Sequence, residues 1–206
     1  MITKEKLIEL NLLYKEAKPS DIIKKAFEFS HEAVVTTNFR PYEVAILHAV
    51  NLVKSNVDVV WCDTGYNTPQ TYRHAHEVID KLQLIVSLYV PQQTAAYRDV
   101  LMGIPNVDNP KHALFTEQVK LEPFRRAMEI HKPKVWFTNL RKGQTAFRDS
   151  IGIFSISKDG VLKVSPFYYW SDTDLDAYLE EYNLPNEFKY FDPTKALENR
   201  ECGLHS

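Results

Sequence analysis

Cysteine is scarce in this chain: only Cys62 and Cys202 occur among its 206 residues. Two thiols cannot form a disulfide framework, and they cannot supply the four thiolates of a cysteine-ligated zinc or iron–sulfur site within one chain. Few cysteines are also usual for a protein of a reducing compartment. We therefore expect a cytoplasmic protein with no iron–sulfur cluster and no metal site.

An excess of charge of one sign and long apolar runs are also lacking. The 25 basic and 27 acidic side chains give a formal net charge of −2, which argues against a protein that coats nucleic acid. No apolar stretch approaches the roughly 20 residues of a membrane helix. The first ten residues alternate charged and apolar side chains, without the apolar region of a signal peptide. We expect neither nucleic acid nor a membrane as a partner.

The composition that remains is that of an ordinary globular chain. Hydrophobic residues make up 44% and charged residues 25% of the sequence, so a core can form without covalent staples. No internal repeat, low-complexity stretch or linker divides the chain. The length suits one domain, and we expect residues 1–206 to form it.

Short apolar segments alternate with helical patterns along the chain. Strands are predicted at 33–37, 57–62, 84–90 and 134–139, and the turn Lys158-Asp159-Gly160 predicts a hairpin of 153–157 with 161–165. Helical spacing predicts helices at 3–18, 20–27, 41–50, 68–82, 94–102, 113–131 and 171–179, and the pattern fades into coil after 183. This alternation predicts an α/β fold, one domain with a parallel-rich sheet and helices on both faces.

Three strand ends carry polar residues suited to chemistry, because ligands of an open parallel sheet bind beyond the carboxyl ends of its strands. The first is Thr36-Thr37-Asn38-Phe39-Arg40. Its hydroxyls and backbone N–H groups lie where a strand meets a helix and can hold phosphate. The alternative is an ordinary turn in which Thr37 or Asn38 caps the helix.

The second strand end is Asp63-Thr64-Gly65-Tyr66, directly after a buried strand. The Asp63 carboxylate can accept a hydrogen bond from a ribose hydroxyl. Gly65 has no side chain and allows a ligand to approach the backbone closely. A capped loop without a ligand explains the same residues equally well.

The third strand end, from Arg141 to Arg148, is the richest in hydrogen-bond donors. Arg141, Lys142, Gln144 and Arg148 lie in it, and no carboxylate occurs before Asp149. Guanidinium groups suit bidentate recognition of phosphate or sulfate. A solvated basic loop is the common alternative, but the position after a strand favours anion binding.

Cys202 lies in a C-terminal segment without hydrophobic periodicity, which indicates that it is not part of the core. Arg200 and His205 flank it, and either cation would favour the thiolate, the nucleophilic form of cysteine. An incidental terminal thiol and, more weakly, a metal pair with His205 are the alternatives. Cys62, at the end of an apolar strand, is interpreted as a buried core residue.

Four segments of the chain, taken together, match one family. They are Asp63-Thr64-Gly65-Tyr66 with Pro69, Thr71 and Tyr72; Trp136-Phe137 with Leu140-Arg141, Gln144 and Arg148; Val164-x-Pro166 with Trp170; and Glu201-Cys202-Gly203-Leu204-His205. From about Ala33 to His205 the chain resembles the assimilatory phosphoadenylyl-sulfate (PAPS) reductases and, more distantly, the adenylyl-sulfate (APS) reductases. The terminal segment is the most specific of the four.

The resemblance implies an adenine-nucleotide α-hydrolase-like fold with a modified phosphate loop. It also implies a two-step reaction, in which Cys202 on a mobile tail (residues 185–206) attacks the sulfur of the sulfonucleotide and becomes S-sulfocysteine. Thioredoxin or glutaredoxin then releases sulfite, and a homodimer is compatible with the family. The residues that it implies for substrate binding are Thr36, Thr37, Phe39, Arg40, Asp63, Gly65, Arg141, Lys142, Gln144, Arg148 and His205.

The chain departs from the family pattern in three respects. Thr37-Asn38-Phe39-Arg40 stands where the family usually has Ser-Ser-Phe-Gly. The segment between Leu184 and Cys202 is shorter and lacks the usual Gly-Asp-x-His-type stretch. The paired cysteines of the iron–sulfur APS reductases are missing, which favours PAPS as the substrate.

Three other functions stay open at this point. A cluster-free APS reductase fits the same two cysteines. An ATP-dependent adenylating relative of the PP-loop type would use the loop from Thr36 to Arg40, although that loop lacks the glycines of the usual Ser-Gly-Gly-x-Asp-Ser. The third is a non-catalytic module that binds a nucleotide.

Overall fold

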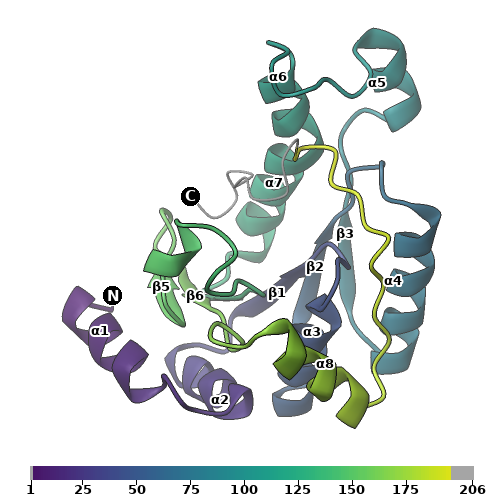
Figure 1. Cartoon of the computed structure of the whole chain (residues 1–206). Coiled ribbons are helices and arrows are strands. Elements are labelled where there is room, and N and C mark those ends of the chain that lie inside the picture. Colours follow the sequence, from purple (N-terminus) through teal and green to yellow (C-terminus); the bar gives the residue numbers. More distant parts are fainter. Residues whose placement is uncertain (1, 196–206) are drawn as a thin grey trace.

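The computed structural model describes residues 2–195, which are built around one six-stranded sheet (Figure 1). The strands are β1 (Ala33–Thr37), β2 (Asp58–Cys62), β3 (Val86–Tyr89), β4 (Val135–Phe137), β5 (Phe154–Ile156) and β6 (Leu162–Val164). Their order is β3-β2-β1-β4-β6-β5, and all neighbours are parallel except β5 and β6, which form a hairpin. The predicted α/β domain with a parallel-rich sheet is confirmed.

Helices cover the two faces of the sheet unevenly. Those before β4 are α1 (Lys4–Leu13), α2 (Pro19–Phe29), α3 (Glu43–Val53), α4 (Pro69–Leu82), α5 (Ala95–Leu101), α6 (His112–Thr116) and α7 (Glu122–His131). A 3₁₀ turn (Arg148–Ser150) and α8 (Asp172–Glu181) follow β4. Helices α2 and α3 pack on β1, β4 and β6, and α8 packs on α3, whereas α7 packs on β2 and β3. Within residues 2–195, no helix combines the length and the apolar character needed to span a bilayer.

The two faces arise from the alternation of side chains along the strands. Val35, Val59 and Phe137 are register partners, and all three enter the large core with α2, α3 and α8. The preceding residues Val34 and Trp136, also partners, enter the smaller core under α7. Because residues paired in register on neighbouring strands point to the same face, each core contains one row of apolar side chains that runs across the strands.

Several helix boundaries differ from the sequence-based expectation. The helix expected over 3–18 ends at Leu13, and the one expected over 41–50 spans Glu43–Val53. Pro19, expected to separate two helices, is the first residue of α2, where its missing N–H would be unpaired in any case. The helix expected over 113–131 is interrupted by a π-helical turn, Glu117–Leu121. The turn ends two residues before Pro123, which has no N–H to continue the ladder of hydrogen bonds.

The topology places a crevice between β1 and β4. From β1 the chain continues to β2 and β3 on one side of the sheet and returns to β4 on the other side. Such a switch point is where open α/β sheets bind ligands. After α8 the described chain contains no further helix or strand. Its last part, residues 186–195, is called the C-terminal strap here and runs beside α4 toward the carboxyl ends of the strands (Figure 1).

Candidate active site

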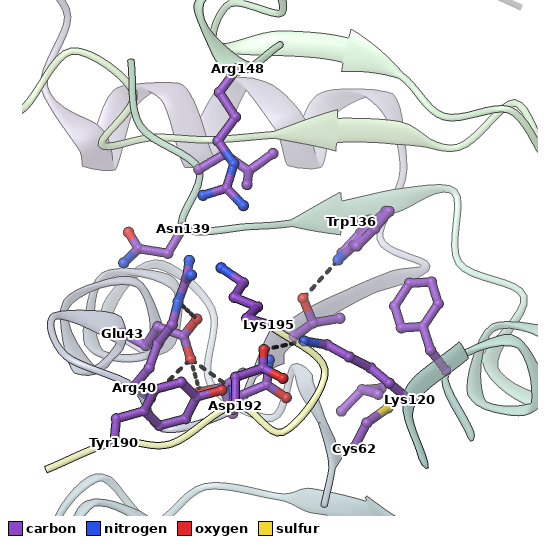
Figure 2. A pocket seen from close by; sticks show the side chains of 16 residues that line it. Arg40, Glu43, Cys62, Lys120, Trp136, Asn139, Arg148, Tyr190, Asp192 and Lys195 are labelled. Carbon is purple, nitrogen blue, oxygen red and sulfur yellow. Dashed lines mark hydrogen bonds and ion pairs between the residues drawn. The ribbon is translucent and has the colours of Figure 1, made fainter. Parts of the chain in front are cut away.

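A cavity lies at the switch point, beyond the carboxyl ends of β1 and β4. Four residues predicted from the sequence line it, namely Thr36, Thr37, Arg40 and Arg148. Figure 2 shows that the strap also contributes to the lining. The cavity measures about 50 Å³, which is room for a few waters, whereas small-ligand pockets typically span about 300–1,000 Å³. The cavity, with the strap as part of its wall, is thus smaller than a typical ligand pocket.

The loop after β1 is held by Glu43 in the first turn of α3. One oxygen of its carboxylate accepts hydrogen bonds from the Thr37 hydroxyl (2.9 Å) and the Asn38 N–H (2.7 Å). The other oxygen accepts one from Arg40 Nε at 2.7 Å. The Glu43 side chain is only 6% exposed.

Thr36, near the end of β1, and Phe39, in the loop that follows, have different surroundings. The Thr36 hydroxyl faces the cavity and accepts a hydrogen bond from Trp136 Nε1 at 2.9 Å. Phe39 is 1% exposed, and its ring packs edge-on against Trp61 with the centroids 4.8 Å apart. The structure therefore places Thr36 at the cavity and Phe39 in the core beneath it.

Asp63 organises its own loop. Its carboxylate accepts hydrogen bonds from the Gly65 N–H (2.9 Å), from Asn67 Nδ2 (2.8 Å) and from the Tyr72 hydroxyl (3.0 Å). Burial, followed by the negative charge of Asp63, raises the pKa of Tyr72 to about 12. Neither Asp63 nor Gly65 lines the cavity. These contacts are those of the capped-loop alternative.

The basic loop after β4 splits into two parts. Arg148 is 4% exposed, lines the cavity and donates to Gln144 Oε1 at 2.5 Å. Arg141 instead forms an ion pair with Asp172 at 2.6 Å, at the start of α8. Lys142 is exposed at the surface. Of the three predicted cations in this loop, Arg148 is the one that the structure brings to the cavity.

Lys120 and Asp192 form a buried ion pair at the cavity (Figure 2). Lys120 Nζ lies 2.5 Å from Asp192 Oδ2, and the two side chains are 3% and 6% exposed. The Thr194 hydroxyl donates to the other Asp192 oxygen at 2.6 Å. Burial opposes the ionisation of Asp192, but Lys120 and Thr194 outweigh it and hold the pKa of this carboxyl below its usual value. The pair fastens the strap to the π-helical turn.

The two cysteines are placed very differently. Cys62 lines the cavity but is buried, as expected, with 6% of its surface exposed. Burial raises the pKa of this thiol to about 12, although the nearby charges of Lys120 and Arg126 oppose the shift. Cys62 is therefore protonated at neutral pH. Cys202 and His205, together with the part of the expected tail from residue 196 onward, lie outside the described residues.

Positive charge predominates around the cavity. Four cationic side chains and two carboxylates line it: Arg40, Lys120, Arg148, Lys195, Glu43 and Asp192. Asn139 contributes a side-chain oxygen that is buried and has no hydrogen-bond partner within the described chain. A buried acceptor of this kind is expected to meet a donor from a ligand or a water. The lining suits an anionic ligand that also carries hydrogen-bond donors.

Several cavity residues were not predicted as site residues from the sequence. They are Asn139, Tyr190, Lys195 and the two members of the buried ion pair. For Lys120 the available signal was its place in a segment that resembles the family, next to Glu122-Pro123. No sequence signal marks the strap residues, which come from coil. Within residues 2–195, no group of three His, Cys, Asp or Glu side chains is arranged to hold a metal ion.

Comparisons with known proteins agree on one family. The model of the phosphoadenosine phosphosulfate reductase domain matches residues 32–191. The phosphoadenosine 5'-phosphosulfate reductase of Vibrio atlanticus (strain LGP32) is 30% identical over an alignment of length 200, with 84% of this chain and 75% of that protein covered. The enzyme of the same name from Enterobacter sp. (strain 638) is 28% identical over 202 residues, with 84% and 80% covered.

Solved structures show the same fold. A PAPS reductase from Candida auris, in a phosphate complex, superposes with a TM-score of 0.79 at 23% identity and with 90% of both chains covered. The FMN adenylyltransferase of Candida glabrata, in complex with FAD and pyrophosphate, gives a TM-score of 0.61 at 11% identity, over 90% of this chain and 61% of that one. The adenine-nucleotide α-hydrolase-like fold expected from the sequence is confirmed. Since the family model matches most of the length of this chain, the chain belongs to the phosphoadenosine phosphosulfate reductase family.

Proposed function

We propose that this chain reduces PAPS to sulfite and adenosine 3',5'-bisphosphate, with Cys202 as the nucleophile. The observation that carries the proposal is the cationic cavity at the β1–β4 switch point of a chain in the PAPS reductase family. Lys120 and Arg148 bring buried positive charge to the place where an open sheet of this kind binds its ligand.

The proposed reduction proceeds in two steps, formation of an S-sulfocysteine and its reduction by a protein dithiol. The Cys202 thiolate attacks the sulfur of the sulfonucleotide, and the bond from that sulfur to the phosphate oxygen breaks. Adenosine 3',5'-bisphosphate leaves with the electron pair, and the enzyme carries S-sulfocysteine. One thiol of a protein dithiol of the thioredoxin or glutaredoxin class then attacks the Cys202 sulfur, and the bond from that sulfur to the SO₃ group breaks, which releases sulfite and leaves a mixed disulfide. The second thiol of the partner then displaces the Cys202 thiol from the mixed disulfide. Oxidation of the two partner thiols to a disulfide supplies the two electrons, and Cys202 is regenerated.

Cationic side chains are needed because a thiolate must approach a sulfur surrounded by negative oxygens. Guanidinium and ammonium groups that are already in place neutralise those oxygens and the charge that develops on the leaving phosphate. Arg148 suits this role because it is 4% exposed and held by Gln144. Donors in a buried site act more strongly than in water, since little solvent screens them.

The remaining parts of the proposal come from the cysteine count and from the resemblance to the family. Two cysteines cannot ligate a four-thiolate cluster within one chain, so we assign no bound iron–sulfur cluster and favour PAPS over APS. The reductant is a protein thiol of the thioredoxin or glutaredoxin class, the expected location is the cytoplasm, and a homodimer is compatible with the family. Thr36, Thr37 and Arg40 contact the substrate from the cavity wall. The roles of Phe39, Asp63, Gly65, Arg141, Lys142, Gln144 and His205 are carried over from the family resemblance.

Mass spectrometry of the purified full-length chain tests this function. The chain is incubated with PAPS or APS without reductant, digested and searched for the mass of one SO₃ group on Cys202. We expect the adduct with PAPS, and its release as sulfite when thioredoxin is added. An adduct that forms preferentially with APS would identify a cluster-free APS reductase. The absence of an adduct with both nucleotides would contradict a reductase function. Iron and sulfide analysis of an anaerobic preparation tests the cluster separately.

A further inference from the structure

We propose that the C-terminal strap is an internal competitor of the substrate, with the Asp192 carboxylate bound to Lys120 where an anionic group of the substrate binds. Entry of the substrate then exchanges one anion for the other on Lys120 and lifts the strap. The inference rests on the proposed function, because it takes the cavity to be the sulfonucleotide site. It adds a gate formed by this chain's own residues.

The first argument is the surroundings of the ion pair. Lys120 and Asp192 are 72 residues apart in the sequence, and their side chains are nearly completely buried at 2.5 Å from each other. The Asp192 oxygens also accept hydrogen bonds from the Thr194 hydroxyl and N–H, at 2.6 and 3.0 Å. Thr194 belongs to the strap itself, so the partner that the body of the protein offers to the carboxylate is Lys120, a buried cation of the kind that binds phosphate or sulfate.

The second argument is space. Tyr190, Asp192 and Lys195 of the strap all line the cavity, which measures about 50 Å³ (Figure 2). A nucleotide needs several times that volume, because small-ligand pockets typically span about 300–1,000 Å³. The cavity is thus too small for such a ligand while the strap is in place, and we expect the strap to move out when the ligand enters.

The third argument is how lightly the strap is attached elsewhere. It pairs with no strand, and its other contacts with the body of the protein include the Tyr42 N–H to Asn186 Oδ1 (2.9 Å) and the Thr68 hydroxyl to the Lys189 carbonyl (2.7 Å). Two of its aromatic side chains, Phe188 and Phe191, are 65% and 44% exposed, and the Phe188 ring packs edge-on against Tyr42 with the centroids 5.7 Å apart. A segment with few buried apolar contacts opens at low cost in free energy.

The exchange also avoids an electrostatic penalty. Breaking a buried ion pair and leaving one charge unpaired is strongly unfavourable. A substrate phosphate or sulfate replaces the Asp192 carboxylate on Lys120, so the lysine keeps a partner while Asp192 moves into water. Differential affinity of this kind is what lets a ligand shift a two-state equilibrium. Because Cys202 follows Lys195 by seven residues, strap movement is covalently linked to the nucleophile.

Limited trypsin digestion of the full-length chain, read by mass spectrometry as the rate of cleavage after Lys195, tests the gate. Adenosine 3',5'-bisphosphate is the anionic probe, and uncharged adenosine is the matched control ligand. In the wild-type chain we expect the bisphosphate to accelerate this cleavage roughly fivefold or more and adenosine to leave it unchanged. Equal or slower cleavage with the bisphosphate overturns the proposal.

Two variants make the test specific. Asp192→Asn removes the competing charge, and we expect faster cleavage after Lys195 without ligand and roughly three- to tenfold tighter binding of the bisphosphate by calorimetry. Glu187→Gln removes one charge from the same strap but not from the cavity, and both readouts should stay within about twofold of wild type. Unchanged or weaker binding in Asp192→Asn overturns the gate.

These readouts separate the gate from the proposed function. Cleavage and bisphosphate binding require no turnover, so they decide the gate even if no sulfite is formed from PAPS. Conversely, sulfite formation with an immobile strap would leave the reductase function standing and remove the gate. If Asp192→Asn does not fold, the wild-type comparison of bisphosphate with adenosine still decides the matter.

Discussion

Arg40 Nε and the Glu43 carboxylate lie 2.7 Å apart at the entrance to α3, and the same carboxylate accepts the Thr37 hydroxyl and the Asn38 N–H. In the family pattern that this chain resembles, glycine usually stands at the position of Arg40. Here the arginine is paired with Glu43, which lies three residues further on. The pair ties the loop after β1 to the helix that follows it.

We expect Glu43→Ala to destabilise the fold by about 2 kcal/mol or more, because it leaves buried donors without an acceptor. Glu43→Gln keeps an acceptor and should cost less. Urea unfolding followed by circular dichroism measures both values. If the free energy of unfolding of Glu43→Ala lies within about 0.5 kcal/mol of the wild-type value, Glu43 does not hold the loop.

Arg148 and Lys142 provide a second comparison within one loop. Arg148 lines the cavity and is buried, whereas Lys142 is exposed. We expect Arg148→Ala to weaken binding of adenosine 3',5'-bisphosphate roughly tenfold or more, since a buried charge-assisted hydrogen bond contributes about 1.5–3 kcal/mol. Lys142→Ala should change it less than about twofold. Calorimetric titration of both variants with the bisphosphate measures the two affinities. Equal losses of affinity would contradict a specific role of Arg148 in binding.

The cysteines should differ in function. Cys202→Ser is expected to abolish sulfite formation from PAPS while bisphosphate binding stays near the wild-type value. Cys62→Ala should keep most of the activity, because the Cys62 thiol is buried and protonated. A sulfite assay with thioredoxin measures both variants. Full activity in Cys202→Ser would show that another group performs the attack.

Thiol labelling tests the pKa of Cys62 directly. With a pKa raised to about 12 by burial, only about one thiol in ten thousand is ionised at pH 8. We expect iodoacetamide to modify Cys62 slowly at pH 8 in the native Cys202→Ser chain and rapidly after unfolding in urea. Fast labelling of the native chain would mean that the thiol is accessible and ionised.

The strap should detach in acid. The pKa of Asp192 is lower in the folded chain than its ordinary value of 3.8, so its contribution to stability is present above that value. The contribution is lost as the pH falls through the folded pKa, because the protonated carboxyl no longer pairs with Lys120. Hydrogen exchange of the Thr194 amide, corrected for its intrinsic pH dependence, should show protection at pH 6 that declines below about pH 4. In Asp192→Asn this decline should be absent.

Much of the fold follows from local patterns in the chain. Val34 and Val35 alternate between two faces, and the turn around Gly160 closes the β5–β6 hairpin. Such features depend on neighbours in the sequence, where side-chain period and turn chemistry act directly. The interruption at Glu117–Leu121 was not predicted, because a π-helical turn has the same composition as the α-helix around it.

The sequence by itself determined the α/β architecture, the strand ends that carry polar residues and the family. Tertiary structure decided which of those residues meet. It turns Arg141 toward Asp172 and Arg148 toward the cavity, and it joins Lys120 to Asp192 across 72 residues. The physical reason is that a site depends on the direction of side chains and on contacts between distant segments. Those are fixed only when the sheet, the π-helical turn and the strap pack together.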